Sequence, residues 1–274
     1  MQRNWVIRKW GADNMHQISM FSWFGFPIPM EERFKLIKDV GFDGVLLWWS
    51  DEYAEVDGDK LLHPELARRN GLLIENIHTP IFRNNCLWED CIDGDALEKT
   101  LLDCIDDCKR FKIPTSVVHI THGNNPLPYN QIGLNRIKNL VEAAERNNVN
   151  IALENLRRPD YLDFVFTHIH SDRLGFCYDS GHEKCYTKGT DLLSKYGSSL
   201  MALHLHDNDG TDDQHLIPGE GLIDWSVVKK KLWEVNYPGA IALEVTNEFS
   251  KNIDDKDPKV FLKRAYEAAR RLVL

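Results

Sequence analysis

Four apolar runs of this chain each end in a carboxylate or an imidazole. The runs are short, have the composition of buried strands, and end at Glu154, Asp179, His206 and Glu244. Helical stretches separate them, as in a parallel barrel, which gathers the side chains at its strand ends around one mouth. The pattern therefore predicts a parallel α/β fold whose chemistry lies at the carboxyl ends of the strands.

Apolar periodicity from Gln17 onward predicts eight strands that alternate with eight helices. We expect strands at 17–21, 44–49, 72–77, 115–119, 149–154, 174–179, 200–206 and 240–245. We expect helices at 30–40, 60–70, 95–111, 131–147, 160–170, 190–196, 225–235 and 258–272. Eight alternations in 274 residues predict one α/β domain, residues 1–274, that folds as a single (β/α)8 TIM barrel after an N-terminal extension, residues 1–14.

A doubly wound open sheet is the structural alternative. Such a sheet usually has a glycine-rich phosphate turn after its first strand, and residues 21–27, Phe-Ser-Trp-Phe-Gly-Phe-Pro, lack that pattern. The apolar run at 45–49 is continuous rather than alternating, as expected for a parallel strand that is covered on both faces. Both observations favour the barrel.

Charge and hydropathy limit the classes of partner. A formal charge of −9 at pH 7 gives no general attraction to nucleic acid, so a small-molecule substrate is favoured over nucleic acid. No apolar run approaches the roughly 20 residues that span a bilayer, and residues 1–10 lack a signal-peptide core, so we expect a cytoplasmic protein without a membrane partner. The six cysteines include no Cys-x-x-Cys pair, which argues against a cysteine zinc knuckle.

Further ligand-type side chains lie at or after the ends of the predicted strands. They are His78, His119, His182, Asp213 and His215. Crowded carboxylates repel one another or become protonated unless a cation lies between them, so the whole set indicates a metal site. Its oxygen-rich core suits Mg²⁺, Mn²⁺, Co²⁺ or Zn²⁺, and the histidines shift the preference towards zinc or another transition metal.

The choice between two histidines and the role of two tryptophans each have an alternative. His204 lies two residues before His206 and on the same side of its strand, so it competes for the ligand role, and we prefer His206 because it is nearer the mouth. Trp23 and Trp49 follow the first and second strands. Their rings either belong to the core and rim or form an apolar wall for substrate binding, and the two interpretations carry equal weight.

The motifs Asp-x-x-His at 179–182 and His-x-Asn-Asp at 206–209 resemble the xylose-isomerase-like barrel superfamily, which includes AP endonuclease family 2. The resemblance covers roughly residues 15–274. In the sugar isomerase and epimerase branch it implies one divalent ion held by Glu154, Asp179, His206 and Glu244. It also implies that both glutamates are the catalytic acid and base, that His182 contacts substrate oxygens, and that the metal stabilises an enediolate.

The endonuclease IV branch of the same superfamily implies a larger number of ions. There, three zinc ions use nine ligands, and this chain has a candidate for each. The three sets would be His78, His119 and Glu154; Glu154, Asp179, His206 and Glu244; and His182, Asp213 and His215. However, the stretch between His206 and Asp213 is shorter than in that branch, and lysines and arginines that would follow DNA phosphates are sparse after the strands.

We therefore expect a metal-dependent isomerase or epimerase of a sugar or sugar phosphate, with one bound ion. The alternatives are a phosphoesterase with up to three zinc ions and an inosose-type dehydratase, because proton abstraction alpha to a carbonyl also starts dehydration. A barrel that binds a sugar without turnover is disfavoured, since binding alone requires no acid–base pair. Arg157 and Arg158 either hold a substrate phosphate or form a solvated loop pair. The resemblance also implies a homo-oligomer.

Overall fold

The structure, a computed structural model, describes residues 17–273. The predicted N-terminal extension, residues 1–14, lies outside the described part. The strands are β1 (Ile18–Phe21), β2 (Gly44–Trp48), β3 (Leu73–His78), β4 (Thr115–Val118), β5 (Asn150–Glu154), β6 (Leu174–Asp179), β7 (Leu200–His204) and β8 (Ile241–Leu243). The helices are α1 (Met30–Val40), α2 (Ala54–Asp57), α3 (His63–Arg69), α4 (Ile92–Phe111), α5 (Gln131–Asn147), α6 (Asp160–His168), α7 (Ser180–Tyr186), α8 (Leu192–Tyr196), α9 (Trp225–Glu234) and α10 (Pro258–Leu272).

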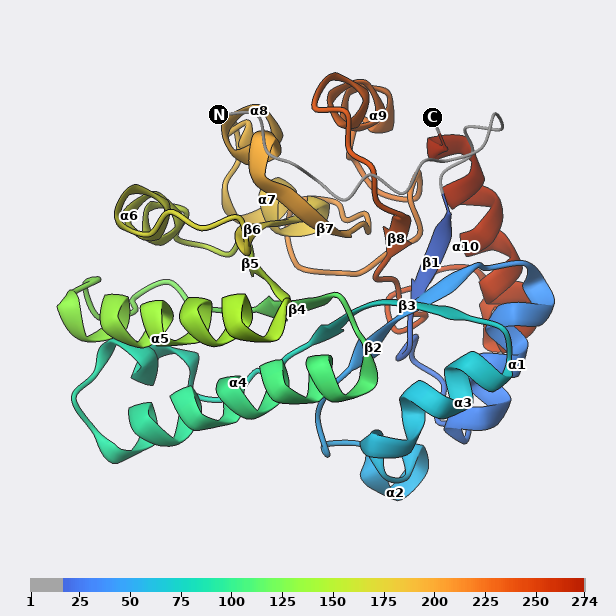
Figure 1. Cartoon of the computed structure of the whole chain (residues 1–274). Helices are drawn as coiled ribbons and strands as arrows, with labels where there is room; N and C mark the ends of the chain where they lie inside the picture. The colour runs from blue at the N-terminus through green and yellow to red at the C-terminus, as the bar shows by residue number, and fades with distance from the viewer. Residues whose placement is uncertain (1–16, 274) are drawn as a thin grey trace.

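The eight strands form one parallel sheet in the order β7-β6-β5-β4-β3-β2-β1-β8. Consecutive strands from β1 to β7 pair with one another, and β1 also pairs with β8, so the sheet curves round on itself. Figure 1 shows the strands in the centre with the helices around them. The predicted (β/α)8 TIM barrel is confirmed, and parallel strands place all their carboxyl ends at one mouth.

The barrel closes between β7 and β8 through a single residue. Among residues 17–273, the pairing found between these two strands is the parallel bridge of Leu205 with Leu243, which we call the seam. Leu205 N donates to Ala242 O at 3.0 Å, and Glu244 N donates to Leu205 O at 3.1 Å. His204 precedes Leu205 at the end of β7, and Glu244 follows Leu243 after β8. The two residues therefore belong to the two different strands that the seam joins.

The barrel interior beneath the mouth is built from small side chains. Val117, Ala152, Cys177 and Ala202 form a buried cluster on four adjacent strands, β4 to β7. Each lies two residues before a polar residue at its strand end, and side chains two apart on a strand point the same way. These four residues therefore form an apolar floor under the polar side chains of the mouth.

Several helix ends follow the chemistry expected from the sequence. Asp224 caps α9, and its carboxylate accepts hydrogen bonds from Ser226 N and Val227 N. Gly41 ends α1 with a φ of 121°, a backbone conformation that side chains with a Cβ rarely adopt. Such signals explain why the predicted helix positions agree with the observed ones to within a few residues.

Two helices were not predicted, and the seventh and eighth strands each end two residues earlier than predicted, at 204 and 243. The helices α2 and α7 were not expected, because four and seven residues are too few to show a helical period. The seventh strand ends at His204 rather than at 206, since the seam makes Leu205 an isolated bridge. A search of the described residues for helices long and apolar enough to cross a membrane found none.

Candidate functional site

Strand ends bring a group of buried acids and imidazoles together at the mouth. Glu154, Asp179 and His204 are the last residues of β5, β6 and β7. His119 and Glu244 directly follow β4 and β8. All five side chains are buried, although the surface of a protein is where unpaired charges are normally found. Their burial together implies strong interactions among them.

The carboxylate of Glu154 lies at the centre of the group. Its Oε2 atom is 3.5 Å from Nε2 of His78, 3.2 Å from Nε2 of His119 and 3.0 Å from Nδ1 of His204. Its Oε1 atom is 3.1 Å from Nδ1 of His182. Burial alone would raise the pKa of Glu154, but His119 and His204 outweigh burial and hold that pKa well below its usual range.

His204 links the two glutamates. Its Nδ1 atom is 3.0 Å from Oε2 of Glu154 and 2.9 Å from Oε2 of Glu244, and its side chain is fully buried. The sequence argument set His204 aside in favour of His206. The structure brings both histidines to the mouth, but they belong to different groups of ligand-type atoms.

Asp213 is the centre of the second group. Its carboxylate is 3.0 Å from Nε2 of His182, 3.6 Å from Nε2 of His215 and 3.6 Å from Nε2 of His206. The rings of His206 and His215 stack with their centroids 4.0 Å apart. His206 also lies 3.0 Å from Oδ1 of Asp179, so Asp179 borders both groups.

Some buried polar atoms of these two groups have no hydrogen-bond partner, which bears on whether a cation fits between them. Six buried atoms make no hydrogen bond within the described chain: Oε2 of Glu154, Nε2 of His119, Nδ1 and Nε2 of His204, Nδ1 of His206 and Oδ1 of Asp213. Buried polar atoms are rarely left unsatisfied, and here they lie close together without hydrogen-bonding geometry. The sets at the mouth whose ligand atoms lie within 4.8 Å of one another include His78, His119 and Glu154; His78, His204 and Glu244; and His206, Asp213 and His215. These residues fit a bound divalent cation.

Asn155 positions two site residues and was missed by the sequence argument. Its Oδ1 accepts from Asp179 N, and its Nδ2 donates to Asp179 O, both at 2.8 Å. Its backbone oxygen lies 2.9 Å from Nδ1 of His182. The only signal in the sequence was its place directly after Glu154, a polar residue where the buried strand ends.

Gly181 leaves the space that the His206 ring occupies. A Cβ atom added at Gly181 would lie 1.9 Å from Cε1 of His206, closer than two carbon atoms can approach. Ser180 fixes the backbone of the same histidine, because its Oγ accepts from His206 N and donates to His206 O. The start of α7 therefore determines where His206 lies.

The loop after β7 is anchored by Asp207, which brings Asp213 and His215 back to the mouth. The carboxylate of Asp207 accepts from Trp225 Nε1 at 2.8 Å and from Gly219 N at 2.9 Å. Asp207 also pairs with Leu216 in a short antiparallel bridge. These contacts fold the loop over the barrel, which the sequence spacing alone did not show.

The two tryptophans of the predicted substrate wall have different places. Trp49 is buried, donates from Nε1 to Asp107 at 3.0 Å, and packs against Phe111 of α4. It therefore faces the helices rather than the mouth, and its assignment to the wall is corrected. Side chains alternate along β2, so Trp48 faces inward instead, with its ring 5.1 Å from that of His78. Trp23 stacks on Tyr53 and stays partly exposed.

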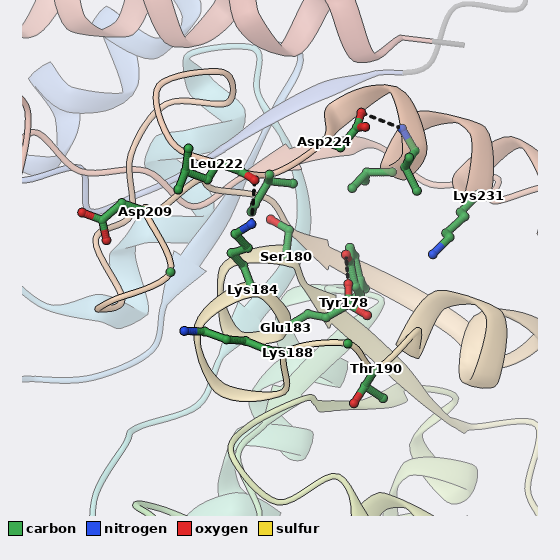
Figure 2. A pocket seen from close by; sticks show the side chains of 15 residues that line it. Tyr178, Ser180, Glu183, Lys184, Lys188, Thr190, Asp209, Leu222, Asp224 and Lys231 are labelled. Carbon is green, nitrogen blue, oxygen red and sulfur yellow. Dashed lines mark hydrogen bonds between the residues drawn. The ribbon is translucent and has the colours of Figure 1, made fainter.

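A cavity of about 460 Å³ lies outside this site, on the flank of the barrel. Figure 2 shows it between α7, the loop after β7 and α9. Tyr178 donates to Glu183 in its wall, and Lys184 Nζ donates to Leu222 O. Its lining includes none of the nine predicted ligand residues, so the chemistry of the mouth lies elsewhere.

A family model described as xylose isomerase-like TIM barrel matches residues 34–265. The chain is 39% identical to protein y4fM of Sinorhizobium fredii over 35% of its length and 29% identical to protein MJ1311 of Methanocaldococcus jannaschii over 59%. These matches span 34% and 60% of the two relatives. Fructoselysine 3-epimerase of Escherichia coli O157:H7 is 22% identical, over 90% of this chain and 94% of the relative.

Solved structures with the same fold include the IolI protein and L-ribulose 3-epimerase. The IolI protein with a bound zinc atom has a TM-score of 0.76 at 16% identity, covering 93% of this chain and 97% of that one. L-ribulose 3-epimerase has a TM-score of 0.70 at 18% identity, covering 94% and 96%. At these identities the likeness establishes the shared barrel fold.

Proposed function

The chain belongs to the xylose isomerase-like TIM barrel family, and from this premise we propose that it is a metal-dependent isomerase or epimerase of a sugar or sugar phosphate. The observation that carries the proposal is the pair of glutamates, Glu154 and Glu244, on either side of His204. Relatives named as 3-epimerases support the same reaction type.

The proposed ligands of the metal are Glu154, Glu244 and His204, with Asp179 from the neighbouring strand. We assign His204 in place of His206, because His204 contacts both glutamates and keeps two unsatisfied ring nitrogens. A divalent cation bound there would polarise a substrate carbonyl and stabilise negative charge on its oxygen. The imidazoles favour zinc, manganese or cobalt over magnesium, and one ion is sufficient for this chemistry.

The two glutamates have the arrangement that proton transfer requires. Glu154 ends β5 and Glu244 follows β8, and the Oε2 atoms of both lie within 3.0 Å of Nδ1 of His204, so one would remove a proton alpha to a carbonyl while the other returns a proton on the opposite face. We propose Glu244 as the base, because it is the more exposed of the two. His182 would orient substrate hydroxyls, held by Asn155 and Asp213.

Arg157 is the proposed anchor if the substrate carries a phosphate. Its guanidinium carbon lies 3.6 Å from the ring centroid of Tyr186, and Tyr186 stacks on His182 with centroids 5.2 Å apart. The column of rings leads from Arg157 to the mouth. Arg158 is a poorer candidate, because Asp160 already accepts hydrogen bonds from its guanidinium at 2.7 and 2.9 Å.

Solvent deuterium uptake tests the proposed reaction. The metal-loaded protein would be incubated in deuterium oxide with a panel of ketoses, inososes and hydroxyketones, and the products examined by mass spectrometry. We expect deuterium at the carbon alpha to the carbonyl of at least one substrate, together with its epimer or isomer. Absence of exchange across the panel would contradict the proposal, and release of water from an inosose would indicate a dehydratase.

A second candidate function, a trinuclear-zinc phosphoesterase, is favoured by one observation. Several overlapping sets of ligand-type atoms lie close together at the mouth, where one ion would need a single set. Zinc content and nicking of an abasic DNA duplex test this candidate. About three zinc ions per chain with nicking would support it, whereas one ion without nicking would remove it.

A further inference from the structure

The loop between β3 and α4 brings two thiols and a carboxylate together, away from the strand ends. The donor atoms of Cys86, Glu89 and Cys91 all lie within 4.8 Å of one another, and the three residues are partly exposed. We propose that they form a separate binding site for a thiophilic divalent cation, with Zn²⁺ the best match. The proposal is independent of the reaction assigned to the mouth.

The distances already approach those of a zinc site. Tetrahedral zinc, with zinc–sulfur bonds near 2.3 Å and zinc–oxygen bonds near 2.0 Å, separates its ligand atoms by about 3.3–3.8 Å. Sγ of Cys91 lies 3.8 Å from Oε2 of Glu89. The other separations, within 4.8 Å, need a shift of about 1 Å or less, which rotation of partly exposed side chains supplies. Water would complete the fourth position.

Arg136 holds the backbone that carries these donors. One guanidinium nitrogen of this buried residue donates to the backbone oxygens of Cys86, Leu87 and Glu89, at 3.0, 3.0 and 2.6 Å. Its second terminal nitrogen donates to Asp95 on α4 at 2.7 Å. A loop fixed in this way loses little conformational freedom when a metal binds, so the donors are preorganised.

The charges of the three donor groups favour a bound cation over a disulfide between the two cysteines. Binding of Zn²⁺ would release one proton from each thiol and leave two thiolates and a carboxylate around the metal. Without a cation, burial and the neighbouring Glu89 carboxylate raise the pKa of the Cys86 thiol and so disfavour its thiolate form. The thiolate is the form that attacks another sulfur, so the same carboxylate opposes a Cys86–Cys91 disulfide.

The site would secure one wall of the mouth. The neighbouring residues Asn84 and Trp88 donate to the backbone oxygens of His119 and Ile120, at 2.9 and 2.7 Å. A metal that ties Cys86 to Cys91 closes a loop that contains Trp88 and begins two residues after Asn84. We therefore expect the cation to have a structural role, holding the segment after β4 in place.

Cobalt binding to the full chain tests the proposal. The protein would be stripped with a chelator under reducing conditions and titrated with Co²⁺, which shows a near-ultraviolet charge-transfer band only when thiolates are ligands. We expect this band in the wild type, its loss in the double variant Cys86→Ser, Cys91→Ser, and its retention in Cys185→Ser, where another partly exposed cysteine is changed. Circular dichroism would show whether each variant is folded.

Glu89→Gln provides a milder variant that keeps both thiols. We expect it to weaken Co²⁺ binding roughly 10–100-fold while keeping the thiolate band at saturation. Absence of the band in the wild type, or its persistence in the double variant, would overturn the proposal, the latter pointing to Cys177 in the barrel. The thiolate band reports on the cysteine site and deuterium uptake reports on the mouth, so the two tests can fail separately.

Discussion

The imidazole of His204 lies with its Nδ1 atom 2.9 Å from Oε2 of Glu244, across the seam that closes the barrel. One residue is the end of β7 and the other follows β8, the two strands with the least backbone pairing between them. A ligand bound to both would therefore join the two edges of the sheet as well as take part in chemistry.

We predict that His204 matters more for metal binding at the mouth than His206. His204→Gln should weaken zinc binding there roughly 100-fold or more, because the glutamates lose the imidazole between them. His206→Gln should weaken it less, by roughly tenfold, since His206 contacts the proposed ligand Asp179 from outside the metal's own ligands. Calorimetric titration of the stripped variants measures both. The reverse order would restore His206 as the ligand.

Replacement of Glu244 should abolish proton transfer. In Glu244→Gln, measured at saturating metal, we expect deuterium uptake into the substrate to fall roughly 10²–10⁴-fold, the usual contribution of a general base. Glu248→Gln, which changes an exposed glutamate four residues further on, is the matched control and should keep its activity. Equal rates in the two variants would exclude Glu244 as the base.

Arg157 should discriminate phosphorylated substrates from their unphosphorylated forms. Arg157→Gln is expected to raise KM for a sugar phosphate roughly tenfold or more, because a charge-assisted hydrogen bond contributes about 1.5–3 kcal/mol. KM for the free sugar and kcat for both should change little. Arg158→Gln, whose guanidinium is bonded to Asp160, should leave the ratio of the two KM values unchanged. If both arginine variants shift that ratio equally, the phosphate has no specific anchor at Arg157.

His63 should make the protein less stable in mild acid. Burial lowers the pKa of this histidine below its ordinary value of 6.5, and its Nε2 already pairs with Asp57 O at 3.0 Å. Because the pKa is lower in the folded than in the unfolded state, the contribution of neutral His63 is present above pH 6.5 and is lost as pH falls through the folded pKa.

Thermal unfolding of the chelated protein at about pH 7.5 and about pH 5.5 measures this loss. The drop in midpoint temperature between the two conditions should be smaller in His63→Gln than in the wild type. His168→Gln, which changes an exposed histidine, should show the wild-type drop. A drop of wild-type size in His63→Gln would mean that other buried groups cause the acid sensitivity.

The positions of the strands could be predicted from apolar periodicity, and four of the predicted runs end in a carboxylate or an imidazole. Parallel strands share one direction, so the carboxyl ends of β5, β6 and β8 had to meet, and Glu154, Asp179 and Glu244 do lie at one mouth. The meeting of these strand ends at one mouth follows from the order of apolar and polar residues along the chain.

The remaining details depend on single residues, which periodicity does not resolve. The choice between His204 and His206 depended on whether the seventh strand ended at 204 or at 206. The side chains of Trp48 and Trp49 face opposite ways because they are consecutive residues at the end of β2. Asn155 and the donors around Cys86 act through loop geometry, which has no period to detect.

Hydrogen exchange of the backbone amides at the seam should also report whether a cation is bound at the mouth. Two amides close it, those of Leu205 and Glu244, while every other pair of neighbouring strands shares a ladder. Local opening is easiest where backbone hydrogen bonds are fewest, so these two amides should exchange their hydrogens with solvent faster than those of the other barrel strands. A cation between His204 and Glu244 would slow that exchange, and the protection of two amides would then report occupancy before any substrate is known.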